Sequence, residues 1–306
     1  MTAPAQESLR AHSAALAYSS RYGERALLIA TPDEILEERY GAGLSPQQPH
    51  ALYSGTKSFW GVLATAVRDD GLLELDEPVA RTVEEWRTDI WKSRVTLRQL
   101  LNLTSGMPFG GLGKAVPLYG KALATPLQDE PGTVFRYSGI PLQVFGAVLA
   151  RKLSAAMQTP HDFLRLRLLD RAGVNVASWR TLADGTRPLP TGAFLTARDW
   201  CLYGGFLLRA IAGKEAGVLR PDSVRECLEG SAVNARYGLG FWLYRSAGGL
   251  QVAYASGSGG QALYLVPERE LVVVRFADGG GSYKHETFLS RLLSSAPLAF
   301  RGEGAA

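Results

Sequence analysis

Ser54-Gly-Thr-Lys57-Ser-Phe-Trp-Gly-Val-Leu-Ala-Thr-Ala-Val67 is the stretch from which the fold and the chemistry of this chain can be inferred. Its large apolar residues recur three and four positions apart, which is the spacing of a buried helical face. Asp70-Gly71 follows as a helix stop. The stretch therefore predicts a helix that begins near Ser54 and crosses the hydrophobic core.

The first turn of this predicted helix is unusual. As an ordinary N-cap, Ser54 would accept a backbone hydrogen bond, but a capping box has Glu or Gln where this chain has Lys57. A cation there also opposes the helix dipole, at a cost of about 0.3–1 kcal/mol. Ser and Lys three residues apart share a helical face within reach of one hydrogen bond. Burial and the dipole favour the neutral amine, so we expect the pKa of Lys57 to fall toward neutrality and its amine to activate Ser54.

The Ser-x-x-Lys spacing is a weak signal alone, because the chain contains 21 Ser and seven Lys. A second candidate group lies in residues 131–139, which read as a turn and an extended segment before a helix opened by Pro141. From such a loop the phenol of Tyr137 can project into a cleft and act with Lys57 as a general base. The alternative is that Tyr137 is a half-buried aromatic that covers the core.

The third candidate is the glycine-rich segment Gly257-Ser258-Gly259-Gly260-Gln261-Ala262. It fits the dinucleotide pattern G-x-G-x-x-A, but a strand follows it where that pattern opens a helix, so we exclude a dinucleotide site. Glycines also let a backbone approach a substrate closely, with an amide of residues 258–261 directed at a developing oxyanion. A plain glycine-rich hairpin turn is the competing interpretation.

The wider pattern predicts strands at both ends of the chain and helices between them. The expected strands are 25–30, 34–40, 237–245, 250–255, 261–266 and 271–276, and the expected helices are 7–22, 96–103, 141–153, 160–169, 196–212 and 283–294. We therefore predict an α/β fold of the α+β type, with an antiparallel sheet built from both chain ends and flanked by helices. Residues 1–75 and 231–306 would form the lobe with the sheet, residues 76–230 an inserted, mostly helical lobe, and the active site would lie at their seam.

Composition excludes several classes of function. The 306 residues are 46% hydrophobic and 20% charged, as in globular proteins, and the net charge of +4 (33 basic against 29 acidic) comes without a run of like charges. We therefore expect no nucleic-acid partner. The sequence lacks an apolar run of roughly 18 residues, so we expect no membrane partner either. The first residues show no signal-peptide pattern, which favours the cytoplasm; a periplasmic or secreted location is the alternative if a leader was removed.

The sequence also argues against a metal or a cofactor. The four histidines are His12, His50, His161 and His285, and the two cysteines are Cys201 and Cys227; none has ligand or redox spacing. There is no P-loop and no G-x-S-x-G element. We expect two buried free thiols, no metal and no cofactor. The oligomeric state is left open.

Read in order, the candidate segments resemble the three motifs of serine β-lactamases and penicillin-binding proteins, and most of all the class C β-lactamase-like serine hydrolases, a group that includes esterases, D-aminopeptidases and oligoamide hydrolases. The similar segments are Ser54–Lys57, Tyr137–Gly139, Gly257–Gly260, Thr96–Met107, Tyr237–Trp242 and Leu265–Arg269, within residues 24–295. The resemblance implies that Ser54 is the acylated nucleophile and that Lys57 and Tyr137 share the proton transfers. It also implies an oxyanion hole formed by the amide of Ser54 and one amide among Ser258, Gly259, Gly260 and Gln261.

Three positions depart from the pattern of that group. Gly139 stands where Asn is common, Ser258 where Lys or His is common, and Leu103 where His is common. The first two remove contacts that a β-lactam or a D-alanyl peptide would use. We therefore expect a serine hydrolase acting on a small carboxylic ester or amide, ahead of a β-lactamase or D-alanyl-type peptidase. A covalently acylated sensor and a scaffold that has lost its activity are also compatible with these motifs, because a fold does not fix a function.

Overall fold

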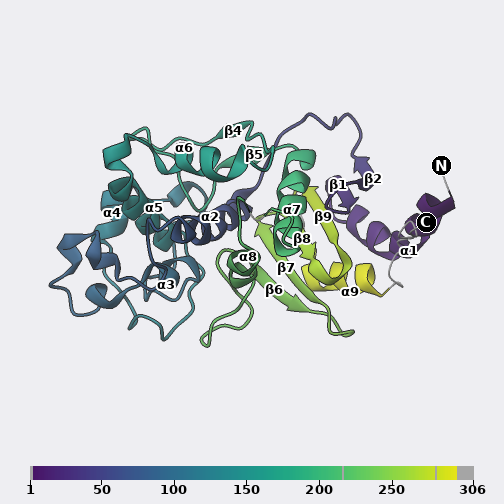
Figure 1. The fold of residues 1–306 in the computed structure, drawn as a ribbon. Coiled ribbons are helices and arrows are strands. Elements are labelled where there is room, and N and C mark those ends of the chain that lie inside the picture. The colour runs from purple at the N-terminus through teal and green to yellow at the C-terminus, as the bar shows by residue number, and fades with distance from the viewer. Residues whose placement is uncertain (1–2, 216, 280, 295–306) are drawn as a thin grey trace.

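The computed structural model describes residues 3–215, 217–279 and 281–294. Its main sheet is antiparallel, with strand order β2-β1-β9-β8-β7-β6 (Figure 1). These strands are β1 (Glu24–Ala30), β2 (Ile35–Tyr40), β6 (Trp242–Arg245), β7 (Gln251–Gly257), β8 (Gln261–Val266) and β9 (Leu271–Ala277). Because β1 pairs with β9, the two ends of the chain meet in the centre of the sheet. The predicted sheet is confirmed.

The two faces of this sheet are covered by different helices (Figure 1). On one face lie α1 (Ala3–Ser20) and α9 (His285–Leu293), and on the other lies α7 (Ala197–Ile211). Alternate residues of β1 divide between the two cores: Leu27 and Ile29 pack with α1 and α9, whereas Leu28 joins the larger core that includes α7. This is the side-chain alternation that a strand buried on both faces requires.

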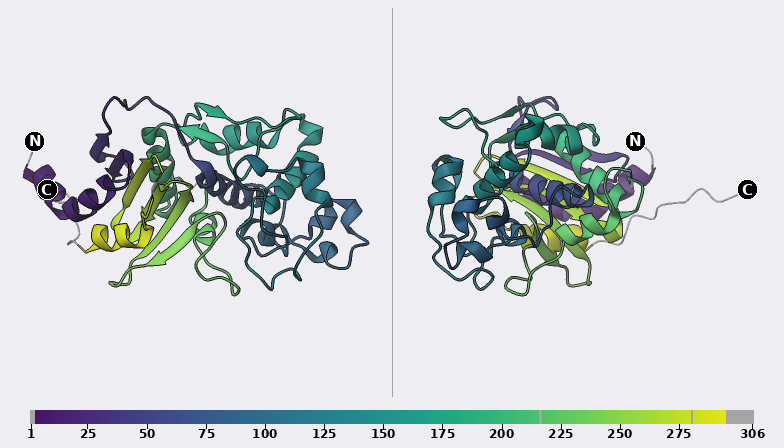
Figure 2. Two further views of the ribbon diagram at one scale, coloured as in Figure 1. Left: turned by 180° about the vertical axis from the view of Figure 1, so that it is seen from behind. Right: turned by 60° about the vertical axis from the view of Figure 1, so that its left-hand side comes forward.

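The rest of the described chain is mainly helical. Its helices within residues 58–164 lie toward the end of the molecule away from α1 and α9, as the view from behind in Figure 2 shows, whereas the helix of residues 221–227 lies beside the sheet (Figure 1). Its helices are α2 (Ser58–Asp69), α3 (Leu97–Leu101), α4 (Tyr119–Ala124), α5 (Ile140–Lys152), α6 (Pro160–Leu164) and α8 (Pro221–Cys227). A small sheet of order β3-β5-β4 joins β3 (His50–Ala51), β5 (Ala193–Leu195) and β4 (Ser178–Trp179). The helix predicted over 160–169 is α6 followed by a π-helical turn, Arg165–Leu169.

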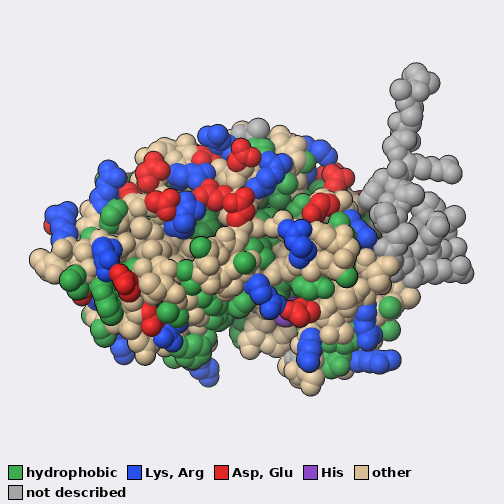
Figure 3. All heavy atoms as spheres, turned by 90° about the horizontal axis from the view of Figure 1, so that it is seen from below, with side chains coloured by type: hydrophobic (Ala, Val, Ile, Leu, Met, Phe, Trp, Pro, Cys, Tyr) green, Lys and Arg blue, Asp and Glu red, His purple; other side chains and the backbone are tan. Residues whose placement is uncertain are grey.

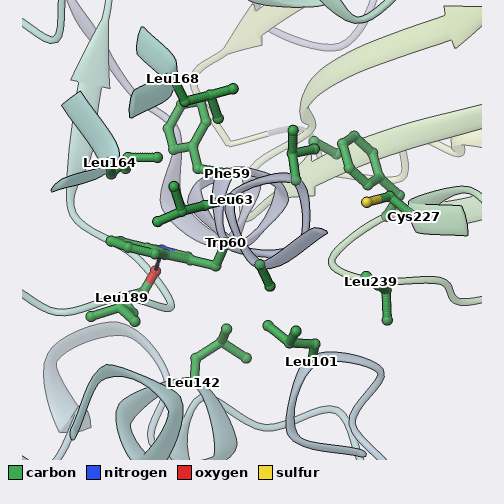
Figure 4. Close-up of a cluster of buried hydrophobic side chains, with 14 of the residues drawn as sticks. Phe59, Trp60, Leu63, Leu101, Leu142, Leu164, Leu168, Leu189, Cys227 and Leu239 are labelled. Atoms are coloured by element: carbon green, nitrogen blue, oxygen red, sulfur yellow. Dashed lines mark hydrogen bonds between the residues drawn. The ribbon is translucent and has the colours of Figure 1, made fainter. Parts of the chain in front are cut away.

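The apolar stretch found first in the sequence forms α2, at the centre of the larger core. Phe59, Trp60 and Leu63 are fully buried, and Figure 4 shows them among leucines from several surrounding elements. The indole Nε1 of Trp60 donates a hydrogen bond to the carbonyl of Leu189 at 2.7 Å (Figure 4). Burial of three large apolar side chains stabilises the fold by about 1.5–3 kcal/mol each. The core therefore holds the helix that follows Ser54 in a fixed position.

The division into one lobe of residues 1–75 with 231–306 and another of residues 76–230 stays a prediction. Within the range 76–230, α7 contacts β1, β8 and β9 of the main sheet. That helix therefore covers the sheet, although the predicted boundary assigns it to the helical lobe.

Charges of both signs are interspersed on the surface seen in Figure 3. Within the described ranges, no helix is both long and apolar enough to cross a bilayer. In the same ranges, no three side chains of His, Cys, Asp or Glu are grouped so that they could hold a metal ion. Cys201 and Cys227 are free and buried, as predicted.

Candidate active site

Ser54 lies in a short 3₁₀ helix, Tyr53–Lys57, that runs directly into α2. The predicted helix therefore begins with a tighter turn than expected. Tyr53, just before the serine, has a left-handed backbone with φ of 47°. Such a backbone costs a non-glycine residue roughly 1–2 kcal/mol, and strain of this kind persists where the surrounding structure enforces it. The turn leaves Ser54 partly accessible at the end of a buried helix.

Lys57 is enclosed one helical turn after Ser54, with 1% of its surface exposed. Its Nζ donates hydrogen bonds to Ser54 Oγ at 3.0 Å and to the carbonyl of Pro190 at 3.1 Å. Burial lowers the pKa of Lys57 to about 7, because an ammonium ion loses its hydration inside the protein. Both the hydrogen bond and the fall of the pKa toward neutrality are confirmed.

Tyr137 comes from the loop before α5 and meets the same pair of residues. Lys57 Nζ lies 5.0 Å from the centre of the Tyr137 ring, and the ring stacks on Trp242 with 5.3 Å between ring centres. Burial raises the pKa of Tyr137, whereas interactions with the Ser54 hydroxyl and the Trp242 indole oppose the rise. Because a raised pKa keeps the phenol protonated at neutral pH, Tyr137 has a proton to donate. The structure thus brings Ser54, Lys57 and Tyr137 together.

The glycine-rich segment reaches this site only in part. Ser258 lines the cleft with Ser54, whereas Gly259, Gly260 and Gln261 are not among the cleft-lining residues. Ser258, Gly259 and Gly260 form the turn between β7 and β8, which matches the glycine-rich hairpin turn considered from the sequence.

Two buried side chains hold this turn from behind. The side-chain amide of Gln261 donates to the carbonyls of Ser258 at 3.1 Å and Ala277 at 2.7 Å. The guanidinium of Arg275 donates to the carbonyl of Gly260 at 2.7 Å. Gln261 and Arg275 therefore position the part of the turn that Ser258 exposes to the cleft.

Glycines set the distance between the sheet and the turn that carries Ser54. A Cβ atom at Gly257 would lie 2.1 Å from the carbonyl oxygen of Leu52, and one at Gly240 would lie 2.5 Å from that of Lys57. Both distances are shorter than real Cβ contacts allow. The absence of side chains at these two positions lets β7 and the segment before β6 pack directly against the turn that carries Ser54.

The cleft between these elements has a volume of about 760 Å³. Besides Ser54, Tyr137 and Ser258, its lining includes Tyr254, Ser256, Asn234, Arg236, Trp242 and His285. Sequence reasoning did not single out Ser256 or His285. The alternation along β7 was a usable signal for Ser256, because residues 254 and 256 share one side of that strand. For His285 the sequence offered no such signal, since only the packing of α9 against the sheet brings this residue to the cleft.

The sequence and the fold of this chain are similar to those of known proteins. The family model for Beta-lactamase matches residues 16–296. No curated protein matches the sequence. Similar solved structures include a putative beta-lactamase from Bacteroides dorei DSM 17855 (19% identity, TM-score 0.73, 89% of this chain and 90% of that chain). A second is a putative 6-aminohexanoate-dimer hydrolase from Bacillus anthracis (17% identity, TM-score 0.72, 89% of this chain and 78% of that chain). A third is a D-stereospecific amidohydrolase from Streptomyces sp. (14% identity, TM-score 0.70, 93% of this chain and 99% of that chain). At these identities the likeness concerns the fold.

Proposed function

The chain belongs to the Beta-lactamase family, and from that premise we propose that it is a serine hydrolase that cleaves a carboxylic ester or amide through an acyl-enzyme on Ser54. The observation that carries the proposal is the 3.0 Å hydrogen bond between Ser54 Oγ and the buried amine of Lys57, whose pKa is about 7. A serine hydroxyl is a weak nucleophile until an adjacent base takes its proton. At neutral pH a large share of the protein carries that base in its active, unprotonated form.

In the acylation step, Ser54 Oγ attacks the substrate carbonyl carbon as its proton passes to Lys57 Nζ. The carbonyl oxygen becomes an oxyanion that accepts hydrogen bonds from the amides of Ser54 and Ser258. The amide of Ser54 suits this role because the first amides of a helix have no intrahelical partner. Ser258 suits it because it lines the cleft, whereas Gly259, Gly260 and Gln261 do not. One such donor typically contributes about 10²–10³ in rate.

Collapse of the intermediate breaks the bond to the leaving group, which needs a proton. Tyr137 is placed to supply it, because its phenol is protonated and interacts with the Ser54 hydroxyl; Lys57 then returns the proton it took from Ser54 to the phenol. Deacylation runs the same transfers with water as the nucleophile, and Ser54 is released as a hydroxyl. The proposed assignment of Lys57 as the base and of Tyr137 as the donor is supported by the hydrogen bond of Lys57 to Ser54 and by the opposite directions of the two pKa shifts.

Two positions favour a small ester or amide over a β-lactam or a D-alanyl peptide. A Cβ at Gly139 would lie 1.9 Å from the carbonyl oxygen of Gly111, so an asparagine side chain has no room there. At position 258 the cleft carries a serine hydroxyl instead of a cationic side chain. A carboxylate or an acylamino group would therefore lack the partners that the family commonly offers.

The test is hydrolysis of a short-chain nitrophenyl ester, together with the mass of the intact protein after treatment with a fluorophosphonate. We expect Ser54→Ala to lower turnover by about 10⁴-fold or more and to abolish labelling, with folding unchanged. Ser154→Ala is a matched control, because that exposed hydroxyl lies outside the cleft and bonds only its own helical turn. Unchanged turnover in Ser54→Ala would remove the nucleophile assignment.

Results for the unaltered protein separate the remaining candidate functions. A stoichiometric burst without turnover would indicate a covalently acylated sensor. Absence of labelling at Ser54 would indicate a scaffold without hydrolytic activity. A panel of esters, amides and a chromogenic cephalosporin then ranks the substrate classes.

A further inference from the structure

A chain of hydrogen bonds runs from the cleft into the smaller core, between the main sheet and helices α1 and α9. His285, the first residue of α9, lines the cleft and places its Nε2 3.1 Å from Ser256 Oγ. Its Nδ1 lies 2.7 Å from the hydroxyl of Tyr264, and that hydroxyl lies 2.9 Å from the hydroxyl of Tyr283. Both ring nitrogens of His285 are therefore occupied, and its orientation is fixed. Ser256 is the member of the chain whose remaining hydrogen-bonding capacity faces the cleft.

The inner end of this chain is a buried cation. The guanidinium carbon of Arg275 lies 3.8 Å from the centre of the Tyr283 ring, and Arg275 has no exposed surface. Its hydrogen bonds to described residues go to Ser19 and to backbone carbonyls of residues 19, 22 and 260, and not to a carboxylate. A cation above the ring draws electron density from the phenol, which makes the Tyr283 hydroxyl a better donor and a poorer acceptor.

This polarity sets the direction of donation along the chain. Burial, together with the charge of Arg275, lowers the pKa of His285 to about 4, so the imidazole is neutral at neutral pH and has a single N–H. If Tyr283 donates to Tyr264, the Tyr264 hydroxyl donates to His285 Nδ1. The remaining N–H, on Nε2, then donates to Ser256 Oγ. The hydroxyl hydrogen of Ser256 is left to point into the cleft.

We propose that Ser256, held by His285 and Tyr264, binds an uncharged hydrogen-bond acceptor of the substrate, such as an ether, ester or amide oxygen outside the bond that is cleaved. This inference rests on the proposed function, because it concerns substrate recognition in the same cleft. Ser256 is well placed for it, since its side chain and Ser54 line the same cleft. In this assignment Ser256 touches the substrate, and His285 and Tyr264 are positioning residues.

The charges around the cleft favour an uncharged acceptor over a carboxylate. Arg236 lines the same cleft, but its guanidinium forms an ion pair with Glu286. Lys57 is engaged by Ser54 and by the carbonyl of Pro190. A neutral imidazole and a serine hydroxyl add no positive charge. A carboxylate that entered this cleft would lose its hydration without gaining a cationic partner, which is unfavourable. An uncharged acceptor loses less hydration and still gains a hydrogen bond from this surface.

The experiment compares pairs of isosteric esters that differ by one oxygen. The first pair varies the acyl side, as nitrophenyl methoxyacetate against nitrophenyl butyrate. The second pair varies the leaving group, as 2-methoxyethyl butyrate against n-butyl butyrate. For each pair the selectivity ratio is kcat/KM of the ether-containing ester divided by kcat/KM of its hydrocarbon isostere. Inductive effects of the oxygen cancel when the ratios of two protein variants are compared.

We expect Ser256→Ala to lower the selectivity ratio of at least one pair by about two- to twelve-fold, the effect of losing one neutral hydrogen bond. Tyr264→Phe and His285→Phe should lower the same ratio while keeping an aromatic ring in place. His285→Gln should restore part of it, because a side-chain amide can donate to Ser256. Ser290→Ala is the control on α9, since its exposed hydroxyl bonds only its own helix. Unaltered ratios for both pairs in Ser256→Ala would overturn the proposal.

Two further readouts make the outcome unambiguous. Fluorophosphonate labelling of Ser54 in every variant separates a failure of this proposal from a failure of the proposed function, because labelling does not depend on the ether oxygen. Nitrogen-15 NMR of histidine-labelled protein at neutral pH should show the Nε2–H tautomer for the signal that disappears in His285→Gln. The Nδ1–H tautomer would overturn the direction of donation and with it the acceptor specificity of Ser256.

Discussion

At the scale of single residues, the proposed chemistry depends on an amine enclosed in the protein. Lys57 forms no ion pair with any carboxylate in the described ranges, and its hydrogen-bond partners there are a hydroxyl and a carbonyl. An enclosed amine without a counter-charge is more stable in its neutral form. The neutral form is the one that can accept the proton of Ser54.

The pH dependence of hydrolysis should therefore report on Lys57. Because the protonated amine cannot act as a base, we expect kcat/KM to fall as the pH drops through the pKa of Lys57, about 7, with a tenfold loss for each pH unit below it. Lys57→Arg should lower kcat/KM by about 10³-fold or more at every pH, since a guanidinium stays protonated. The measurement is a pH–rate profile with a neutral ester. An acid limb that persists unchanged in a weakly active Lys57→Arg variant would assign that limb to another group.

Some of the site could be predicted from local sequence and some could not. The hydrogen bond between Ser54 and Lys57 follows from helical spacing, and the shifted pKa follows from the apolar residues around it. Tyr137 was found through its loop position, although spacing alone did not distinguish it from a core aromatic. His285 and its partner Ser256 were missed because 29 positions separate them, and no local pattern connects a strand to a helix so far along the chain.

At the scale of elements, glycines decide how closely the segments around the nucleophile pack. Gly61 lies within α2, and a Cβ there would lie 2.0 Å from the backbone oxygen of Leu239. Gly240 and Gly257 make similar approaches to Lys57 and Leu52. These contacts involve backbone atoms on both sides, so a methyl group cannot be accommodated by turning a side chain.

Replacing Gly61 should consequently destabilise the protein despite the usual helical preference for alanine. We expect Gly61→Ala to lower the free energy of unfolding by about 1–3 kcal/mol or more, because the new methyl group overpacks the core. Gly120→Ala in α4 is the matched control, since nothing lies within 4 Å of its added Cβ. There the change should be neutral or stabilising by up to about 1 kcal/mol. Urea unfolding of both variants provides the comparison, and equal stability of the two would contradict the packing argument.

The same glycines explain where predicted elements differ from the structure. The strand expected over 237–245 begins only at Trp242. Gly238 and Gly240 precede it, and each packs against backbone outside the sheet, at Cys227 and at Lys57. The segment before Trp242 therefore packs against α8 and the turn that carries Ser54, and it does not extend the strand. Helices α4 and α8, with six and seven residues, were missed because elements so short show too few periods of an apolar face.

At the scale of the whole molecule, the buried amine of Lys57 affects stability. The pKa of Lys57 is lowered on folding from 10.5 to about 7. Between these two values the unfolded chain binds more protons than the folded one, so the free energy of unfolding should rise with pH across that window. Below about pH 7 both states are protonated, and Lys57 contributes no slope.

Lys57→Met should remove this contribution and raise the free energy of unfolding at pH 7 by about 1–3 kcal/mol, because it takes a costly ionisable group out of the core. The measurement is the difference between the two proteins in denaturant unfolding at several values from pH 7 to 10. That difference should shrink as the pH rises. A difference that is constant over the range would show that Lys57 does not titrate there.

The pairing of β1 with β9 has a consequence for how the protein is made. Ser54, Lys57 and Tyr137 leave the ribosome well before residues 251–277, which supply the sheet neighbours of β1 and the turn beside the nucleophile. Until then the backbone N–H and C=O groups along one edge of β1 lack their β9 partners, and such long-range pairing forms slowly. The proposed active site therefore stays incomplete until translation has passed β9.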